Sequence, residues 1–170
     1  MSEFTKKKVI FKFLRLAPII LLYFSVLNEI DFNYYKYISF NFPFILIYYW
    51  SLRKSEALGY GYIFVAGLFN DVVNGLPVGI SSFSYLLICG FAAYLRTITL
   101  RPSIFKDWFF FLFTILVVNS LIYSMLNIFF SVDLNYQNLF YNIFLTFILY
   151  IIFAFIFKIY QQSIFKETND

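Results

Sequence analysis

Six apolar blocks divide the chain, and their lengths constrain its fold more than any other feature. They cover residues 9–27, 37–52, 57–73, 79–95, 108–130 and 139–157. Each block lies near the roughly 17 to 25 residues that a helix needs to cross the hydrocarbon of a bilayer. We therefore expect an all-α, polytopic bundle of six transmembrane helices that forms one integral membrane domain over residues 1–170.

The composition agrees with a multi-pass membrane protein. Of the 170 residues, 62% are hydrophobic and 13% are charged, whereas a soluble domain carries about a quarter charged residues. Histidine is absent and Cys89 is the only cysteine, which excludes a Ser-His-Asp triad, a Cys/His zinc site and an internal disulfide. The sequence also lacks a phosphate-binding loop and paired carboxylates at catalytic spacing, so we expect neither an enzyme nor a bound cofactor or metal.

The basic residues predict the orientation of the six spans. If the amino terminus is cytoplasmic, 12 of the 13 basic residues fall in cytoplasmic segments, and Lys36 alone lies outside. This is the distribution that the positive-inside bias produces when both termini are cytoplasmic. Membrane topology explains the net charge of +4 better than a nucleic-acid surface does, so no nucleic-acid partner is expected. The first block is predicted to be a retained span, because no A-x-A cleavage site follows it.

Proline and tryptophan suggest where some spans begin and end. Pro18 and Pro43 are predicted to bend or start the first and second helices, since proline removes a backbone donor that lipid cannot replace. Trp50 and Trp108 fall at the predicted cytoplasmic boundary, where tryptophan commonly anchors a helix at the interface.

The stretch GLFNDVVNGLPVGISS places a carboxylate in an otherwise apolar run. On a helix, Gly67, Asp71 and Asn74 share a face, with Asn70 beside them. Three interpretations remain open. Asp71 could end the helix with its carboxylate in water, hydrogen-bond the exposed backbone of the following turn, or form a notch for a partner or ligand.

The residues between the third and fourth blocks predict a tight turn near the membrane surface. Gly75, Pro77 and Gly79 are residues that a continuous helix tolerates poorly. Small residues occur on both sides of this turn, at Gly59, Gly61, Ala66 and Gly67 and at Cys89, Gly90, Ala92 and Ala93. Because small side chains let helices approach closely in lipid, we expect the two spans to form a close-packed hairpin.

The fifth block carries a second set of polar residues. At helical spacing they form one stripe, made of Asn119, Ser120, Tyr123, Ser124 and Asn127. Interhelical hydrogen bonds inside the bundle would explain such a stripe, and so would a cavity that binds a substrate.

The second to fourth blocks resemble the rod shape-determining protein MreD family. The resemblance rests on a Pro-containing second helix that ends in Tyr-Trp, a third helix of the form G-x-x-x-D, and a short glycine turn before a leucine-rich fourth helix. The matching residues are Pro43, Tyr49, Trp50, Gly67, Asp71, Gly75 and Gly79. The likeness is closest over residues 43–95.

The resemblance implies a bacterial inner-membrane component of the cell-elongation machinery. It implies work beside a bitopic MreC-like protein, an MreB-like cytoskeletal protein and the synthases of lateral peptidoglycan. On this basis we expect a scaffold whose partner or cavity face comprises Gly67, Asn70, Asp71, Asn74, Gly75 and Gly79.

A transporter function is the alternative. The resemblance also implies a fold similar to the substrate-binding subunits of energy-coupling-factor vitamin transporters. Such a subunit would bind a small molecule through polar and aromatic groups in its outer loops, and Tyr34, Tyr35, Asn135 and Tyr136 offer them. The same residues would equally serve as interfacial belt aromatics.

Overall fold

The computed structural model describes residues 16–27, 40–54, 57–99, 103–130 and 136–165. Within these residues all regular structure is helical, and there is no strand. The helices are Leu16–Leu27, α2 (Phe42–Arg53), α3 (Tyr60–Asn74), α4 (Ile80–Ile98), α5 (Ile104–Phe130) and α6 (Tyr136–Phe165). The prediction of an all-α bundle is thereby confirmed.

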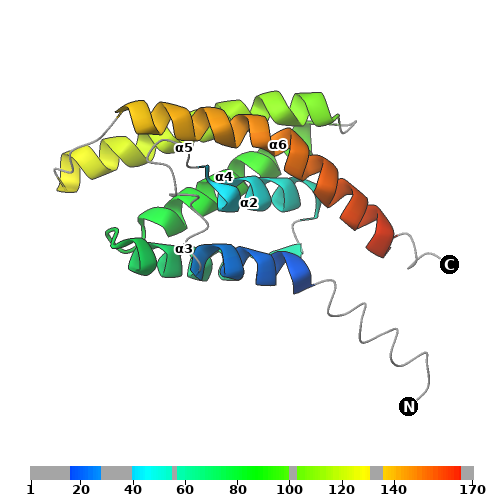
Figure 1. The fold of residues 1–170 in the computed structure, drawn as a ribbon, viewed down its shortest axis with the longest axis horizontal. Helices are drawn as coiled ribbons and strands as arrows, with labels where there is room; N and C mark the ends of the chain where they lie inside the picture. Colours follow the sequence, from blue (N-terminus) through cyan, green and yellow to red (C-terminus); the bar gives the residue numbers. More distant parts are fainter. Residues whose placement is uncertain (1–15, 28–39, 55–56, 100–102, 131–135, 166–170) are drawn as a thin grey trace, which may run out of the picture.

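The helices are arranged around α2 and α4 (Figure 1). The Leu16–Leu27 helix lies beside α3 along one side of the bundle, and α5 and α6 run along the opposite side. Tyr23 joins the first pair, because its hydroxyl donates to the Tyr62 carbonyl (3.1 Å) and its ring packs edge-on against Phe69. Helix α4 contacts α2, α3 and α5, so it links the two sides.

Helix α2 is the buried centre of the bundle. All of its residues except Pro43 and Arg53 are buried. Its 12 residues extend about 18 Å, which is less than the roughly 30 Å of bilayer hydrocarbon. The second span was predicted to begin at residue 37, which is too early, because Phe40 and Asn41 precede the helix. The Asn41 side chain caps the helix by accepting from Phe44 N–H (3.4 Å). Pro43 occupies the first turn of the helix.

The burial of α2 also corrects the prediction for Trp50. Only 2% of Trp50 is exposed, so it is not an interfacial anchor. Its ring packs against Phe157 and Tyr160 of α6. Trp108 is half-buried, and its indole N–H donates to the Phe147 carbonyl (2.8 Å). Both tryptophans therefore contact α6, Trp50 by ring packing from α2 and Trp108 by a hydrogen bond from α5.

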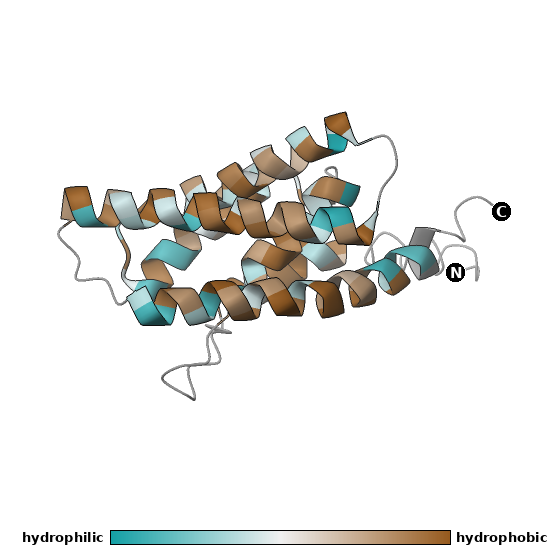
Figure 2. Ribbon diagram, turned by 90° about the horizontal axis from the view of Figure 1, so that it is seen from above, coloured by the Kyte–Doolittle hydropathy of each residue, from teal (hydrophilic) through white to brown (hydrophobic). Residues whose placement is uncertain are grey.

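Two helices of the described segments are long and apolar enough to cross a membrane, namely Ile104–Phe130 and Tyr136–Gln162. The Leu16–Leu27 helix is apolar but shorter. Both long helices extend beyond the predicted blocks 108–130 and 139–157, because helical structure continues through polar residues that lower the local hydropathy. Figure 2 shows hydrophobic residues along most of these helices and hydrophilic ones mainly toward helix ends.

The outer surface of the bundle is apolar. Large hydrophobic side chains are exposed on the Leu16–Leu27 helix, α3, α5 and α6, for example Phe24 (59%), Val72 (69%), Ile128 (74%) and Phe155 (59%). A protein surrounded by water seldom exposes so much contiguous apolar surface. This surface fits a bilayer environment.

Candidate functional site

Asp71 caps a helix other than its own. Its side chain is fully buried, with Oδ2 accepting from Gly79 N–H (2.6 Å) and Oδ1 from Ser81 N–H (2.9 Å). These donors lie at the start of α4, where the first N–H groups of a helix lack intrahelical partners. Gly79, at the N-cap position, has no side chain to bind them. The negative charge is also stabilised by the positive end of the α4 dipole.

The turn between α3 and α4 requires glycine at two positions. Gly75 has φ +63° and Gly79 has φ +104°, both in the left-handed region that disfavours other residues. Gly75 ends α3, and the following Leu76 N–H donates to the Asp71 carbonyl (2.9 Å). Asp71 therefore binds the turn through its main chain and its side chain.

Gly67 allows α3 and α4 to touch along their backbones. A Cβ atom added at Gly67 would lie 2.4 Å from Ser82 Cα and 2.5 Å from Ser82 N. The Ser82 hydroxyl donates to the Phe64 carbonyl (2.8 Å), and Asn70 Nδ2 donates to Ser81 Oγ (2.8 Å). These contacts confirm the predicted close-packed hairpin.

The geometry decides between interpretations of Asp71. The carboxylate does not lie in water, so that interpretation is wrong, and it does hydrogen-bond the turn backbone as the second interpretation predicts. Gly67 and Asp71 lie inside the contact between α3 and α4. Asn74 lies outside it, exposed, and donates from Nδ2 to the Asn70 carbonyl (2.9 Å).

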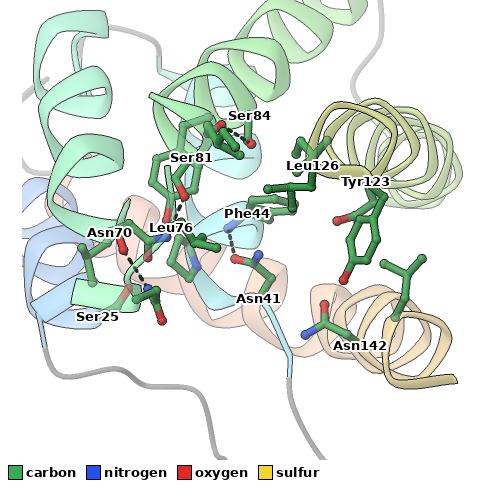
Figure 3. Close-up of a pocket in the computed structure, with 18 residues that line it drawn as sticks. Ser25, Asn41, Phe44, Asn70, Leu76, Ser81, Ser84, Tyr123, Leu126 and Asn142 are labelled. Atoms are coloured by element: carbon green, nitrogen blue, oxygen red, sulfur yellow. Dashed lines mark hydrogen bonds between the residues drawn. The ribbon is translucent and has the colours of Figure 1, made fainter. Parts of the chain in front are cut away.

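A cavity of about 470 Å³ lies beside this hairpin (Figure 3). Helices from both sides of the bundle contribute to its wall. Its lining includes five asparagines, Asn41, Asn70, Asn74, Asn119 and Asn142, together with Ser25, Ser81, Ser84, Tyr85 and Tyr123. The cavity thus brings Asn70 and Asn74 of the first predicted cluster together with Asn119 and Tyr123 of the second.

The polar stripe of α5 lines a second pocket of about 290 Å³ between α5 and α6. All five stripe residues, Asn119, Ser120, Tyr123, Ser124 and Asn127, contribute to it. Asn119 Nδ2 donates to the Ile115 carbonyl and Ser124 Oγ to the Ser120 carbonyl, both at 2.8 Å. Because these bonds stay within α5, they do not hold neighbouring helices together.

An ion pair at the other end of the bundle was missed by the sequence analysis. Arg53, at the end of α2, pairs with Asp107 in the first turn of α5, and the Tyr48 hydroxyl donates to the Asp107 carbonyl (3.2 Å). Asp107 is 3% exposed, so the described residues contain a second buried acid besides Asp71. The sequence does place opposite charges at the ends of two predicted spans, and this pattern could have predicted the ion pair.

Ser25 was also missed by the sequence-based predictions. Its side chain lines the cavity and is 4% exposed, and its hydroxyl has no hydrogen-bond partner within the described residues.

The outer-loop residues assigned to a transporter ligand are only partly described. Tyr34, Tyr35 and Asn135 lie outside the described residues, whereas Tyr136 is exposed and lines the second pocket. The described residues contain no group of three or more His, Cys, Asp or Glu that could hold a metal.

Comparison with protein families matches residues 7–164, almost the whole chain, to the rod shape-determining protein MreD. No curated protein and no solved structure matches the chain. The family consists of membrane proteins that determine rod shape together with the MreB/MreC complex, and it is not known for enzymatic activity. The buried Asp71, the backbone contact at Gly67 and the two-glycine turn lie within the matched residues. The chain belongs to the family of the rod shape-determining protein MreD.

Proposed function

We propose that this chain is a non-enzymatic scaffold of the cell-elongation complex in the bacterial inner membrane. In this proposal it crosses the membrane six times as one domain, with both termini in the cytoplasm. The short α2 completes its crossing through non-helical residues at its ends, which is possible because protein rather than lipid surrounds this helix. Its helices bind a bitopic MreC-like protein and, through the complex, an MreB-like cytoskeletal protein and the synthases of lateral peptidoglycan. Catalysis belongs to the synthases, and this chain supports them by positioning.

The observation that carries the proposal is the α3–α4 hairpin, whose two helices are held together by contacts of their own residues. Asp71 and Gly67 join the two helices on their inner side. The other side of α3 exposes apolar residues, including Phe64 (43%), Phe69 (45%) and Val72 (69%). A surface whose backbone is already fixed loses little conformational entropy when a partner helix binds. The arrangement therefore suits a docking face for a single-span protein.

Crosslinking in cells tests this docking face. A photo-crosslinking residue at Phe69 or Val72 should trap the MreC-like partner, because these residues are 45% and 69% exposed. The same residue at Ile63, which is 2% exposed on the same helix, is the matched control and should trap no partner. If exposed positions along α3 and α5 trap lipid alone while the cells still depend on the protein for their shape, the scaffold proposal fails.

A further inference from the structure

The cavity and the pocket between α5 and α6 adjoin each other. Asn119, Tyr123 and Leu139 line both. Figure 3 shows Tyr123 and Asn142 projecting from the two long helices, at the side of the cavity away from Ser25 and Asn70. The two spaces are therefore neighbours that share these three residues, one beside the α3–α4 hairpin and one between α5 and α6. We name the two together the lateral site.

Among the described residues, the lining of the lateral site is polar and uncharged. Within these residues neither part is lined by Asp, Glu, Lys or Arg. Asparagine carboxamides and serine hydroxyls both donate and accept hydrogen bonds. A phosphate or carboxylate ligand would instead call for Arg or Lys in the lining. The chemistry favours a neutral ligand that carries several hydroxyl groups.

One buried group in the lateral site points to a ligand. The Ser25 hydroxyl is nine-tenths buried or more, and within the described residues nothing bonds it. Leaving a buried hydroxyl unpaired is unfavourable, because the group has lost its hydrogen bonds to water and gained none in the protein. The cavity volume of about 470 Å³ falls within the roughly 300 to 1,000 Å³ of small-molecule sites. A ligand hydroxyl next to Ser25 would supply the missing bond.

The outer part of the lateral site opens on an apolar surface. Leu116, which lines it, is 47% exposed, and Phe140 nearby on α6 is 67% exposed. Along α5, Asn119 lies about 22 Å and Asn127 about 34 Å from Ile104, so the polar stripe approaches the far edge of a roughly 30 Å hydrocarbon layer. A lipid head group at that depth could enter between α5 and α6 while its chains remained in the bilayer.

We propose that the lateral site binds an amphiphile with a neutral, hydroxyl-rich head group of the glycosyl diacylglycerol class. The head group occupies the cavity, where the asparagines and Ser25 bond its hydroxyls, and the acyl chains leave along Leu116 and Ile143. This inference goes beyond the scaffold function. In the proposed orientation the lipid would lie in the outer leaflet, and only that placement rests on the proposed function.

Native mass spectrometry of the protein from lipid nanodiscs tests the proposal. The nanodiscs contain phosphatidylcholine with equal small fractions of glucosyl diacylglycerol and phosphatidylglycerol of the same chain length. We expect the protein to retain the glucosyl lipid in preference to phosphatidylglycerol. Asn119→Leu removes the amide shared by both parts of the site and should lower retention about five-fold, the effect of one lost hydrogen bond.

Two further variants make the result interpretable. Asn138→Leu makes the same substitution at an exposed position of α6 that does not line the lateral site. This variant should retain the lipid as the natural chain does. Tyr123→Phe keeps the ring, so it preserves packing if Asn119→Leu misfolds, and it should also weaken retention.

The proposal is overturned by equal retention of the two lipids, by preference for phosphatidylglycerol, or by unchanged retention in Asn119→Leu and Tyr123→Phe. Displacement of the lipid by excess free glucose would assign the site to a soluble sugar and overturn the amphiphile assignment. None of these outcomes bears on the crosslinking of α3, so the scaffold proposal is tested separately.

Discussion

At the residue scale, two residues decide how α3 and α4 meet, and they do so in opposite ways. Gly67 acts through the space that it leaves, since Ser82 main-chain atoms occupy the position of a Cβ. Asp71 acts through charge and geometry, since its two oxygens bind two N–H groups at the start of α4. Neither role requires a ligand.

Gly67→Ala should destabilise the hairpin. The new methyl would meet Ser82 backbone atoms, which cannot rotate away, so the helices must separate. Overpacking of this kind costs about 1 to 3 kcal/mol. Gly61→Ala on the same helix has nothing within 4 Å of the added carbon and should be neutral or stabilising. The melting temperature of the detergent-solubilised protein measures both effects, and equal values for the two variants would contradict the described contact.

Asp71→Ala should weaken the hairpin without preventing membrane insertion. It leaves the Gly79 and Ser81 N–H groups without their carboxylate, at a cost of about 2 to 4 kcal/mol. We expect reduced pull-down of the MreC-like partner and loss of rod shape at normal protein levels. Thr97→Ala, at an exposed position near the other end of α4, is the control and should retain both. Normal pull-down by Asp71→Ala would argue against the hairpin as the docking element.

At the scale of helices, α2 holds the bundle together although it is the shortest of the labelled helices. Its rings contact α5 and α6, with Tyr48 packed against Phe111 and Tyr150 and Tyr49 against Phe157. The Arg53–Asp107 ion pair adds an electrostatic link between the end of α2 and the start of α5. Aromatic packing and one ion pair thus fix the position of α2.

A double-mutant cycle should detect the Arg53–Asp107 link. Arg53→Met and Asp107→Leu each leave one charge without its partner. Because the Arg53 side chain is 23% exposed, each loss should fall below the roughly 3 to 5 kcal/mol of a fully buried pair. The double variant should be more stable than the sum of the two losses predicts, with a coupling of about 0.5 to 3 kcal/mol. Additive melting shifts would show that the two side chains do not interact in the membrane protein.

At the scale of the whole molecule, the structure separates two ends. The α3–α4 turn and the lateral site lie toward one end, and the Arg53–Asp107 pair lies where α2 ends and α5 begins. In the proposed orientation the first end faces outward and the second faces the cytoplasm. This separation makes the orientation testable from two exposed positions.

Labelling of introduced cysteines should distinguish the two ends. In a Cys89→Ala background, Val78→Cys in the α3–α4 turn, where Val78 is 73% exposed, should react with an impermeant maleimide in intact spheroplasts. Thr97→Cys, exposed near the opposite end of α4, should react only after permeabilisation. In the natural chain, tested separately, Cys89 is 1% exposed and should stay unlabelled. The reverse pattern would place both termini outside.

Helix positions could be predicted from the sequence more accurately than helix ends. The block 79–95 corresponds to Ile80–Ile98, and the glycine turn falls where punctuating residues predict it. The predicted start of α2 was wrong because residues 37–40 are mostly apolar, like the residues of a membrane span. The capping hydrogen bond of Asn41 sets the first residue of the helix instead. Local hydrogen bonds of this kind do not alter hydropathy.

The sequence by itself determined the class of the molecule: apolar helices, a tight turn at Gly75 and Gly79, and membership of the MreD family. Only the tertiary structure decided that Asp71 caps α4, that α2 is buried on all sides and that the α5 stripe meets the cavity. The physical reason is that apolar side chains suit lipid and protein neighbours equally well. Hydropathy therefore locates helices, whereas packing and hydrogen bonding select their neighbours.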